Sequence, residues 1–232
     1  MGIYTSAVYL SLSFDTAPKK GKIAFVAQSG TFGGMLARMA AAHGYGLSKF
    51  VSIGNQADLK AADYLEYLAE DPDTGAIVFY MEGFKDGRRF FNIAREVVKR
   101  KPIIIYKSGR TEAATRATMS HTSSIAGSDK VFEAMCKQVG IIRSYETTQI
   151  FDMAEALVSM PLPKGNRVAI IGSGGQGVTI SDNCELLGLK VPEFDQATKM
   201  QLKKSLPPHA PVPGNPVDFA GGNRGADDEA KV

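Results

Sequence analysis

The chain has 232 residues, of which 44% are hydrophobic and 22% are charged, and its formal net charge at pH 7 is +3. This length and composition suit one large or two smaller globular domains, and the small, dispersed positive charge does not indicate a nucleic-acid partner. No stretch approaches the roughly 18 apolar residues of a membrane helix, and the first residues lack a basic leader region. The two cysteines and three histidines have neither disulfide nor metal-ligand spacing. We therefore expect a soluble, cytoplasmic protein without a metal site.

Short apolar runs alternate with helix-length amphipathic stretches from residue 22 onward, which is typical of βα units in a parallel sheet. The predicted strands are residues 23–27, 50–53, 76–81, 103–106 and 141–145. The predicted helices are residues 32–43, 61–70, 90–100, 129–139 and 148–160. Five strands with crossover helices predict an α/β domain of residues 22–160, with a doubly wound, flavodoxin-like parallel sheet.

Two prolines, Pro161 and Pro163, interrupt this pattern, so residues 161–165 are predicted to be a linker. A second α/β domain of the same kind is predicted over residues 166–232. Its elements are a strand at 167–171, a glycine loop, a helix at 178–187, a short strand at 189–191 and a helix at 196–206, before a proline-rich loop at 207–216. Because the chain then runs out in glycine and charge, we expect this domain to be incomplete.

Two strands are each followed by a glycine turn and a helix. In the first turn, Ser29, Gly30 and Thr31 follow a buried strand, and backbone N–H groups at such a helix start attract anions. Ordinary capping by Ser29 is the alternative interpretation. The second turn contains Gly172, Gly174 and Gly177 in the G-x-G-x-x-G spacing of a dinucleotide site. Since only about 60 residues follow its strand, a complete dinucleotide fold is not favoured.

A histidine and a glutamate are the candidate catalytic residues. His121 lies in a segment of small residues between a predicted strand and a predicted helix, which would place its imidazole in a loop at the carboxyl edge of the sheet. Glu82 ends the apolar run 77–81 and should reach the same edge. A carboxylate there can accept the imidazole N–H and stabilise the charged ring. A locally hydrogen-bonded histidine and a solvated glutamate are the alternative interpretations.

The residues around His121 resemble the phosphohistidine loop of the acyl-CoA synthetase (NDP-forming) family, which includes ADP-forming acetyl-CoA synthetase and is related to succinyl-CoA synthetase. The match consists of S-H-T at 120–122 and A-G-S-D at 126–129, after G-R-T at 109–111. It continues with G-G-x-G at 174–177 and N-P-V-D at 215–218, and covers roughly residues 21–221. Residues 1–21 resemble the tail linker of a CoA-binding domain that the sequence lacks.

This resemblance implies a role for each candidate residue. His121 would carry the transferred phosphate, with Glu82 beside it. The phosphate-binding helix starts would comprise Ser29, Gly30 and Thr31 in the first domain, and Gly174, Gly175, Gln176 and Gly177 in the second. Asn55 and Asp218 match family loops and are further candidate site residues, and the loop of Asn55 would have a positioning role.

The resemblance implies a reaction that interconverts acyl-CoA, phosphate and a nucleoside diphosphate with free acid, CoA and the triphosphate. No bound cofactor is expected except phosphate on His121. CoA and ATP or ADP with Mg²⁺ would act as substrates through a CoA-binding domain and an ATP-grasp domain or subunit, both missing here, and a homo-oligomer is compatible with this interpretation. The alternatives are a ligand-sensing module of a larger protein, such as an acetyltransferase, and a dinucleotide-binding domain.

Overall fold

A parallel sheet forms the centre of the first of two compact units, Met1–Pro161 and Leu162–Val232, in a computed structural model of the chain. The structure describes residues 2–8, 10–12, 18–122 and 127–220, without the side chains of residues 11, 12 and 118–122.

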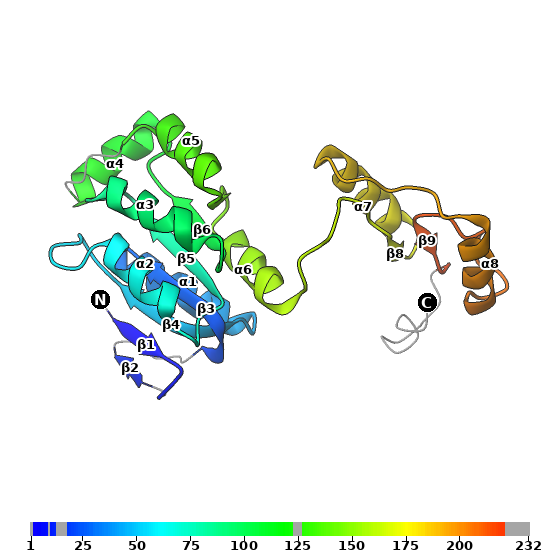
Figure 1. The fold of residues 1–232 in the computed structure, drawn as a ribbon, viewed down its shortest axis with the longest axis horizontal. Helices are drawn as coiled ribbons and strands as arrows, with labels where there is room; N and C mark the ends of the chain where they lie inside the picture. Colours follow the sequence, from blue (N-terminus) through cyan, green and yellow to red (C-terminus); the bar gives the residue numbers. More distant parts are fainter. Residues whose placement is uncertain (1, 9, 13–17, 123–126, 221–232) are drawn as a thin grey trace. The chain divides into compact units, whose positions relative to one another are not determined.

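The first unit contains a seven-stranded sheet within the described residues (Figure 1). Its strands are β1 (Ile3–Thr5), β2 (Leu10–Leu12), β3 (Lys19–Ala27), β4 (Gly46–Ser52), β5 (Ala76–Met81), β6 (Ile103–Lys107) and β7 (Ile142–Ser144). They follow the order β2-β1-β4-β3-β5-β6-β7, in which β3 to β7 are parallel and β1 and β2 are antiparallel additions at one edge. The parallel strands have the flavodoxin-like order, so the predicted fold class is confirmed.

Helices cover both faces of this sheet. They are α1 (Gly30–Ala42), α2 (Ala61–Glu70), α3 (Gly87–Val97), α4 (Glu112–Thr122), α5 (Asp129–Val139) and α6 (Gln149–Ser159). Successive β3 residues alternate between two cores: Phe25 packs with residues of α1 and α6, whereas Val26 packs with residues of α2, α3 and α5. All six residues of β5 are buried. Burial on both faces explains why the central strands are continuous apolar runs in the sequence.

The observed elements differ from the predicted ones mainly where the elements are short. The strands Ile3–Thr5 and Leu10–Leu12 were not predicted, because three residues are too few to show an alternating pattern. Residues 1–21 were assigned to a linker, yet Ile3 pairs with Val51 of β4, so β1 belongs to the sheet of the first unit.

The second unit has a small parallel sheet of β8 (Ile171–Gly172) and β9 (Val217–Asp218), with helices α7 (Gly175–Leu186) and α8 (Gln196–Ser205). The prediction of a strand at 189–191 was wrong, since only Lys190 forms an isolated bridge, to Arg167. The strand predicted at 167–171 is shorter than expected. Its backbone is held instead by Asn215, whose Oδ1 accepts from Ile170 N at 2.9 Å and whose Nδ2 donates to Val168 O at 2.8 Å.

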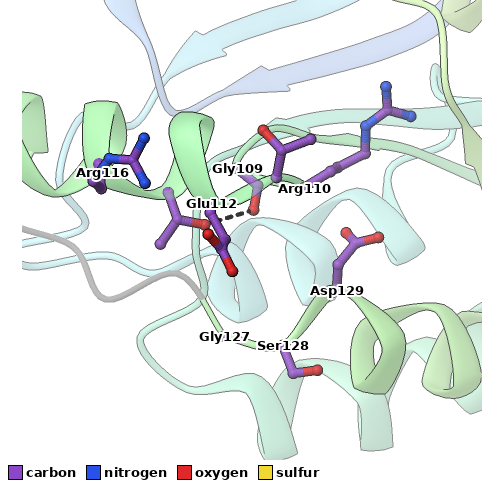
Figure 2. A pocket seen from close by; sticks show the side chains of 9 residues that line it. Gly109, Arg110, Glu112, Arg116, Gly127, Ser128 and Asp129 are labelled. Atoms are coloured by element: carbon purple, nitrogen blue, oxygen red, sulfur yellow. Dashed lines mark hydrogen bonds between the residues drawn. The ribbon is translucent and has the colours of Figure 1, made fainter.

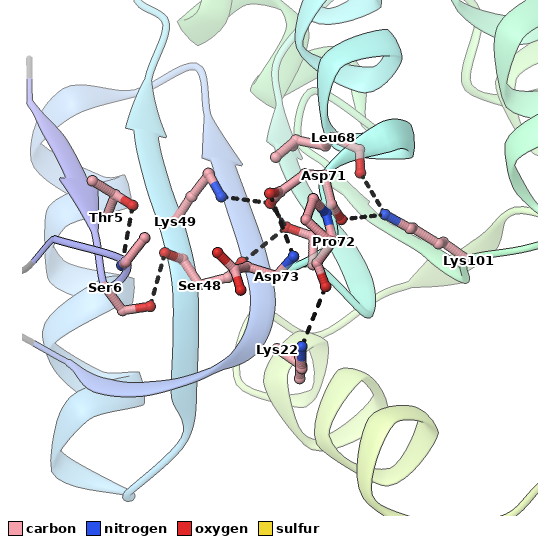
Figure 3. A network of polar contacts seen from close by, with 12 residues as sticks. Thr5, Ser6, Lys22, Ser48, Lys49, Leu68, Asp71, Pro72, Asp73 and Lys101 are labelled. Atoms are coloured by element: carbon pink, nitrogen blue, oxygen red, sulfur yellow. Dashed lines mark hydrogen bonds and ion pairs between the residues drawn. The ribbon is translucent and has the colours of Figure 1, made fainter.

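Three lysines hold the connection between α2 and β5 at the amino end of the sheet (Figure 3). Lys49 Nζ lies 2.5 Å from Asp71 Oδ2, and only 13% and 7% of the two side chains are exposed. Lys101 Nζ donates to Asp71 O at 2.6 Å, and Lys22 Nζ donates to Pro72 O at 3.3 Å. Burial by itself would raise the pKa of Asp71, but its hydrogen bonds, first that from Lys49, keep this pKa below its usual value.

We expect the Lys49→Met variant to destabilise the first unit by about 3 kcal/mol, because a buried Asp71 carboxylate would lose its charged partner. Chemical denaturation at neutral pH measures this loss. The matched control is Lys99→Met, which removes an exposed ion pair with Glu96 and should have no measurable effect. Equal losses in the two variants would contradict this account of the buried pair.

Candidate functional site

The first glycine turn lies at the carboxyl end of β3, where α1 begins. Ser29 is the N-cap of α1: its Oγ accepts from Phe32 N at 3.3 Å and its carbonyl accepts from Gly33 N at 3.0 Å. The predicted capping and anion-binding interpretations of Ser29 are therefore compatible, since the hydroxyl can still donate its own hydrogen. The first turn of α1 contains no acidic residue. The positive end of the helix dipole is thus not neutralised by a carboxylate of its own first turn.

Glu82 follows β5 directly and lies at the same sheet edge as Ser29. In the register of the two strands, Ala27 pairs with Tyr80, so the residues after both strands are neighbours. Only 8% of Glu82 is exposed, and its Oε2 has no hydrogen-bond partner among the described residues. A buried carboxylate oxygen without a partner is costly, which marks Glu82 as a candidate for a functional role.

The direction in which successive strands are added to the sheet changes at β3. From β3 the chain crosses to β4 on one side, whereas β5 lies on the other side of β3. In open α/β sheets, the crevice at the carboxyl ends of two such strands is the usual ligand site. The start of α1 and the Glu82 carboxylate therefore lie where this fold class binds ligands.

The prediction that His121 lies in a loop was wrong for the backbone, because residues 112–122 form α4. This segment contains several good helix formers, including alanines, which we interpreted as loop residues because they are small. Thr111 caps the helix start, with Oγ1 accepting from Ala114 N at 3.2 Å. His121 belongs to the last turn of α4, and its side chain lies outside the described residues.

The residues after the His121 segment are held by a buried arginine. Arg143, whose side chain is 4% exposed, contacts Asp129 Oδ1 through Nη2 at 2.5 Å and Glu133 Oε2 through Nη1 at 2.8 Å. Hydrogen bonds from Tyr145, Lys137 and Arg143 lower the pKa of Glu133 to about 2. This network fixes the first turn of α5, in which Asp129 is the last residue of the matched motif.

The pKa of Glu133 predicts how stability depends on pH. Because its folded value lies below the ordinary value of 4.5, ionised Glu133 stabilises the fold above about pH 4.5, and this contribution is lost as pH falls toward 2. We expect Glu133→Gln to be less stable than the parent chain at pH 7, with a smaller difference at pH 4. Urea denaturation at both pH values measures this. An unchanged difference would contradict the assigned network.

An open pocket of about 430 Å³ lies between the start of α4 and the start of α5 (Figure 2). Its charged lining residues are two arginines and two carboxylates: Arg110, Arg116, Glu112 and Asp129. Arg110 also lies over the ring of Tyr145, 5.2 Å from its centroid. The mixed charge gives this pocket no clear preference for an anion.

The second glycine turn already uses several of its amide groups. Gly174 N donates to Asp218 Oδ1 at 3.1 Å, Gln176 N to Ser173 O at 3.2 Å, and Gly177 N to Gly174 O at 3.2 Å. Hydrogen bonds from Ala220 N and Gly174 N lower the pKa of Asp218. Asp218 therefore contacts the glycine turn directly.

We expect Gly177→Ala to destabilise the second unit by about 1–3 kcal/mol, because the added Cβ would lie 2.8 Å from Pro216 Cβ. Gly175→Ala is the matched control, since its Cβ would meet nothing within 4 Å. Alanine is the better helix former, so this control should be neutral or slightly stabilising. Thermal unfolding of both variants measures the difference, and similar melting temperatures would contradict the packing described.

Two further residues of the site were not predicted from the sequence. Asn55, which was predicted, is exposed in the turn after β4, whereas its neighbour Gln56 is buried and hydrogen-bonds to Gly83 O. Gln28, directly before Ser29, is also buried and accepts from Glu82 N. The one available signal was their position after predicted parallel strands, directly after the strand for Gln28 and three residues beyond it for Gln56.

The fold and the strand-end turns define an α/β protein of the CoA-ligase type. The family model for the succinyl-CoA ligase like flavodoxin domain matches residues 20–157, and that for the Ligase-CoA domain matches residues 167–232. The chain belongs to the NDP-forming acyl-CoA synthetase family, which confirms the resemblance stated from the sequence.

Several ADP-forming acetate–CoA ligases are similar to this chain in sequence. The alpha subunit of acetate–CoA ligase [ADP-forming] II of Pyrococcus furiosus is 44% identical over 98% of this chain and 50% of its own length. Acetate–CoA ligase [ADP-forming] of Methanocaldococcus jannaschii is 40% identical over 95% of this chain and 31% of its own. The chain thus spans half or less of the length of these relatives.

A solved structure agrees with these matches. Acetyl-coenzyme A synthetase 1 of Ca. Korarchaeum cryptofilum, in complex with phosphate and ADP, superposes with a TM-score of 0.87 at 37% identity, over 95% of this chain and 48% of that one. These similarities do not favour the sensing or dinucleotide-binding alternatives. None of the described helices is long and apolar enough to cross a membrane.

Proposed function

We propose that this chain is the phosphoryl-carrying part of an ADP-forming acid–CoA ligase, with His121 as the carrier. In this reaction, phosphate displaces CoA from acyl-CoA to give an acyl phosphate, and the phosphoryl group passes to His121 as the free acid leaves. ADP then takes the phosphoryl group to form ATP. The observation that supports the proposal best is Glu82 Oε2, a buried carboxylate oxygen at the same sheet edge as the start of α1 that has no hydrogen-bond partner among the described residues.

Each residue at the β3–β5 edge has a chemical task in this proposal. The Glu82 carboxylate accepts a hydrogen bond from one imidazole nitrogen, so that the other nitrogen is free to attack phosphorus, and it then stabilises the positively charged phosphorylated ring. The amides of Gly30 and Thr31 offset the negative charge of the phosphoryl oxygens. A helix start contributes about 0.3–1 kcal/mol toward an anion, and more where water is excluded.

The reaction also needs a second phosphate-binding element and sites for CoA and the nucleotide. The turn at Gly174–Gly177 is the second proposed phosphate-binding element, with Gly175 as its exposed N-terminal helix residue. CoA and Mg–ADP would bind to CoA-binding and ATP-grasp parts that complete the ligase. Acetate and ADP are the first substrates to test, since the relatives with 44% and 42% identity are named for them.

We expect the complete ligase to acquire an acid-labile, base-stable phosphate on this chain when it is given ATP and Mg²⁺, or acetyl-CoA and phosphate. His121→Ala should abolish the label, because the carrier nitrogen is lost. His43→Ala and His209→Ala are matched controls that should retain it, since these are the other histidines of the chain. Labelling measured with radioactive phosphate decides the assignment, and label that persists in His121→Ala would refute it.

A further inference from the structure

Two buried glutamines hydrogen-bond to the backbone of Glu82 and of Gly83, which follows it. Gln28, which follows β3, is 3% exposed, and its Oε1 accepts from Glu82 N at 2.9 Å and from Gly83 N at 3.0 Å. Both donors are N–H groups, which fixes the orientation of the amide, because only the oxygen can accept from them. One side chain thus accepts hydrogen bonds from the first two backbone N–H groups after β5.

Gln56, in the loop after β4, contacts the next peptide, through the carbonyl of Gly83. It is 4% exposed, and its Nε2 donates to Gly83 O at 2.9 Å while its Oε1 accepts from Ala61 N, the first residue of α2, at 3.2 Å. Its backbone has a φ of 55°, in the left-handed region that non-glycine residues seldom adopt. Such a conformation persists where surrounding contacts determine it, as the two buried hydrogen bonds of Gln56 do.

These contacts satisfy the backbone around Glu82 but leave one oxygen of its carboxylate without a partner among the described residues. Glu82 N, Gly83 N and Gly83 O all have partners, whereas Glu82 Oε2 is buried without one among the described residues. A loop that needed only to be rigid would gain nothing from a buried carboxylate oxygen without a partner. The arrangement instead fits a carboxylate held ready for a partner that arrives during the reaction.

We propose that Gln28 and Gln56 are positioning residues, which act on phosphoryl transfer only by fixing Glu82. The inference rests on the proposed function, because the arriving partner is the imidazole of His121. Gln28 sets the direction of the Glu82 N–Cα bond through its two acceptor contacts. Gln56 fixes the next peptide and couples it to the start of α2.

The test is a double-mutant cycle in the complete ligase. Gln28→Met removes the acceptor and retains the length of the side chain, so we expect kcat to fall by roughly 10–100-fold while KM for CoA changes little. Gln56→Met should act in the same direction without breaking the Gln28 contacts, and it provides an independent second variant. Gln138→Met, on the exposed surface of α5, is the matched control and should leave kcat unchanged.

The decisive comparison is made in the Glu82→Gln background. If the glutamines act through Glu82, then Gln28→Met should cause little further loss of kcat there, because the group it positions is already inactive. Equal losses in both backgrounds, or an unchanged kcat in the single variants, would overturn the inference. The proposed function fails on a different result, namely label or turnover that survives His121→Ala.

Discussion

The parallel pairing of β3 with β5 is the constraint on which the rest of the site depends. Its register places the residues after Ala27 beside those after Tyr80, so the start of α1 and Glu82 share one sheet edge. The helix must also approach β3 closely, since a Cβ at Gly33 would lie 2.4 Å from Ala27 Cβ. Glycine at this position therefore allows α1 to begin directly against the strand whose end it covers.

The two glycine turns differ in how much of their donor capacity is available. In α7, Gly174, Gln176 and Gly177 each donate within the second unit, and Asp218 brings a carboxylate to the turn. In α1, the first turn contains no acidic residue, and Ser29 caps only the later amides of the turn. The start of α1 is for this reason the better candidate for binding a phosphoryl group.

The sequence predicts an element well where a single physical cause determines its pattern of apolar residues. The strand Ala76–Met81 is buried on both faces and reads as one apolar run, so its bounds and the position of Glu82 after it could be predicted. The helix Glu112–Thr122 could not, because small residues are common in loops as well as in helices. The contacts of Gln28 and Gln56 depend on the register of neighbouring strands and on the path of the loop after β4, which one sequence does not reveal.

The central claim is that a phosphoryl group on His121 is held at the β3–β5 edge. Nuclear magnetic resonance of the isotope-labelled chain tests this claim most directly. Phosphoramidate, which phosphorylates histidine chemically, allows amide spectra to be compared before and after modification. The account predicts that the amide resonances of Gly30, Thr31 and Glu82 shift when His121 is phosphorylated, and that these shifts disappear in His121→Ala. Shifts confined to residues next to His121 in the sequence would contradict it.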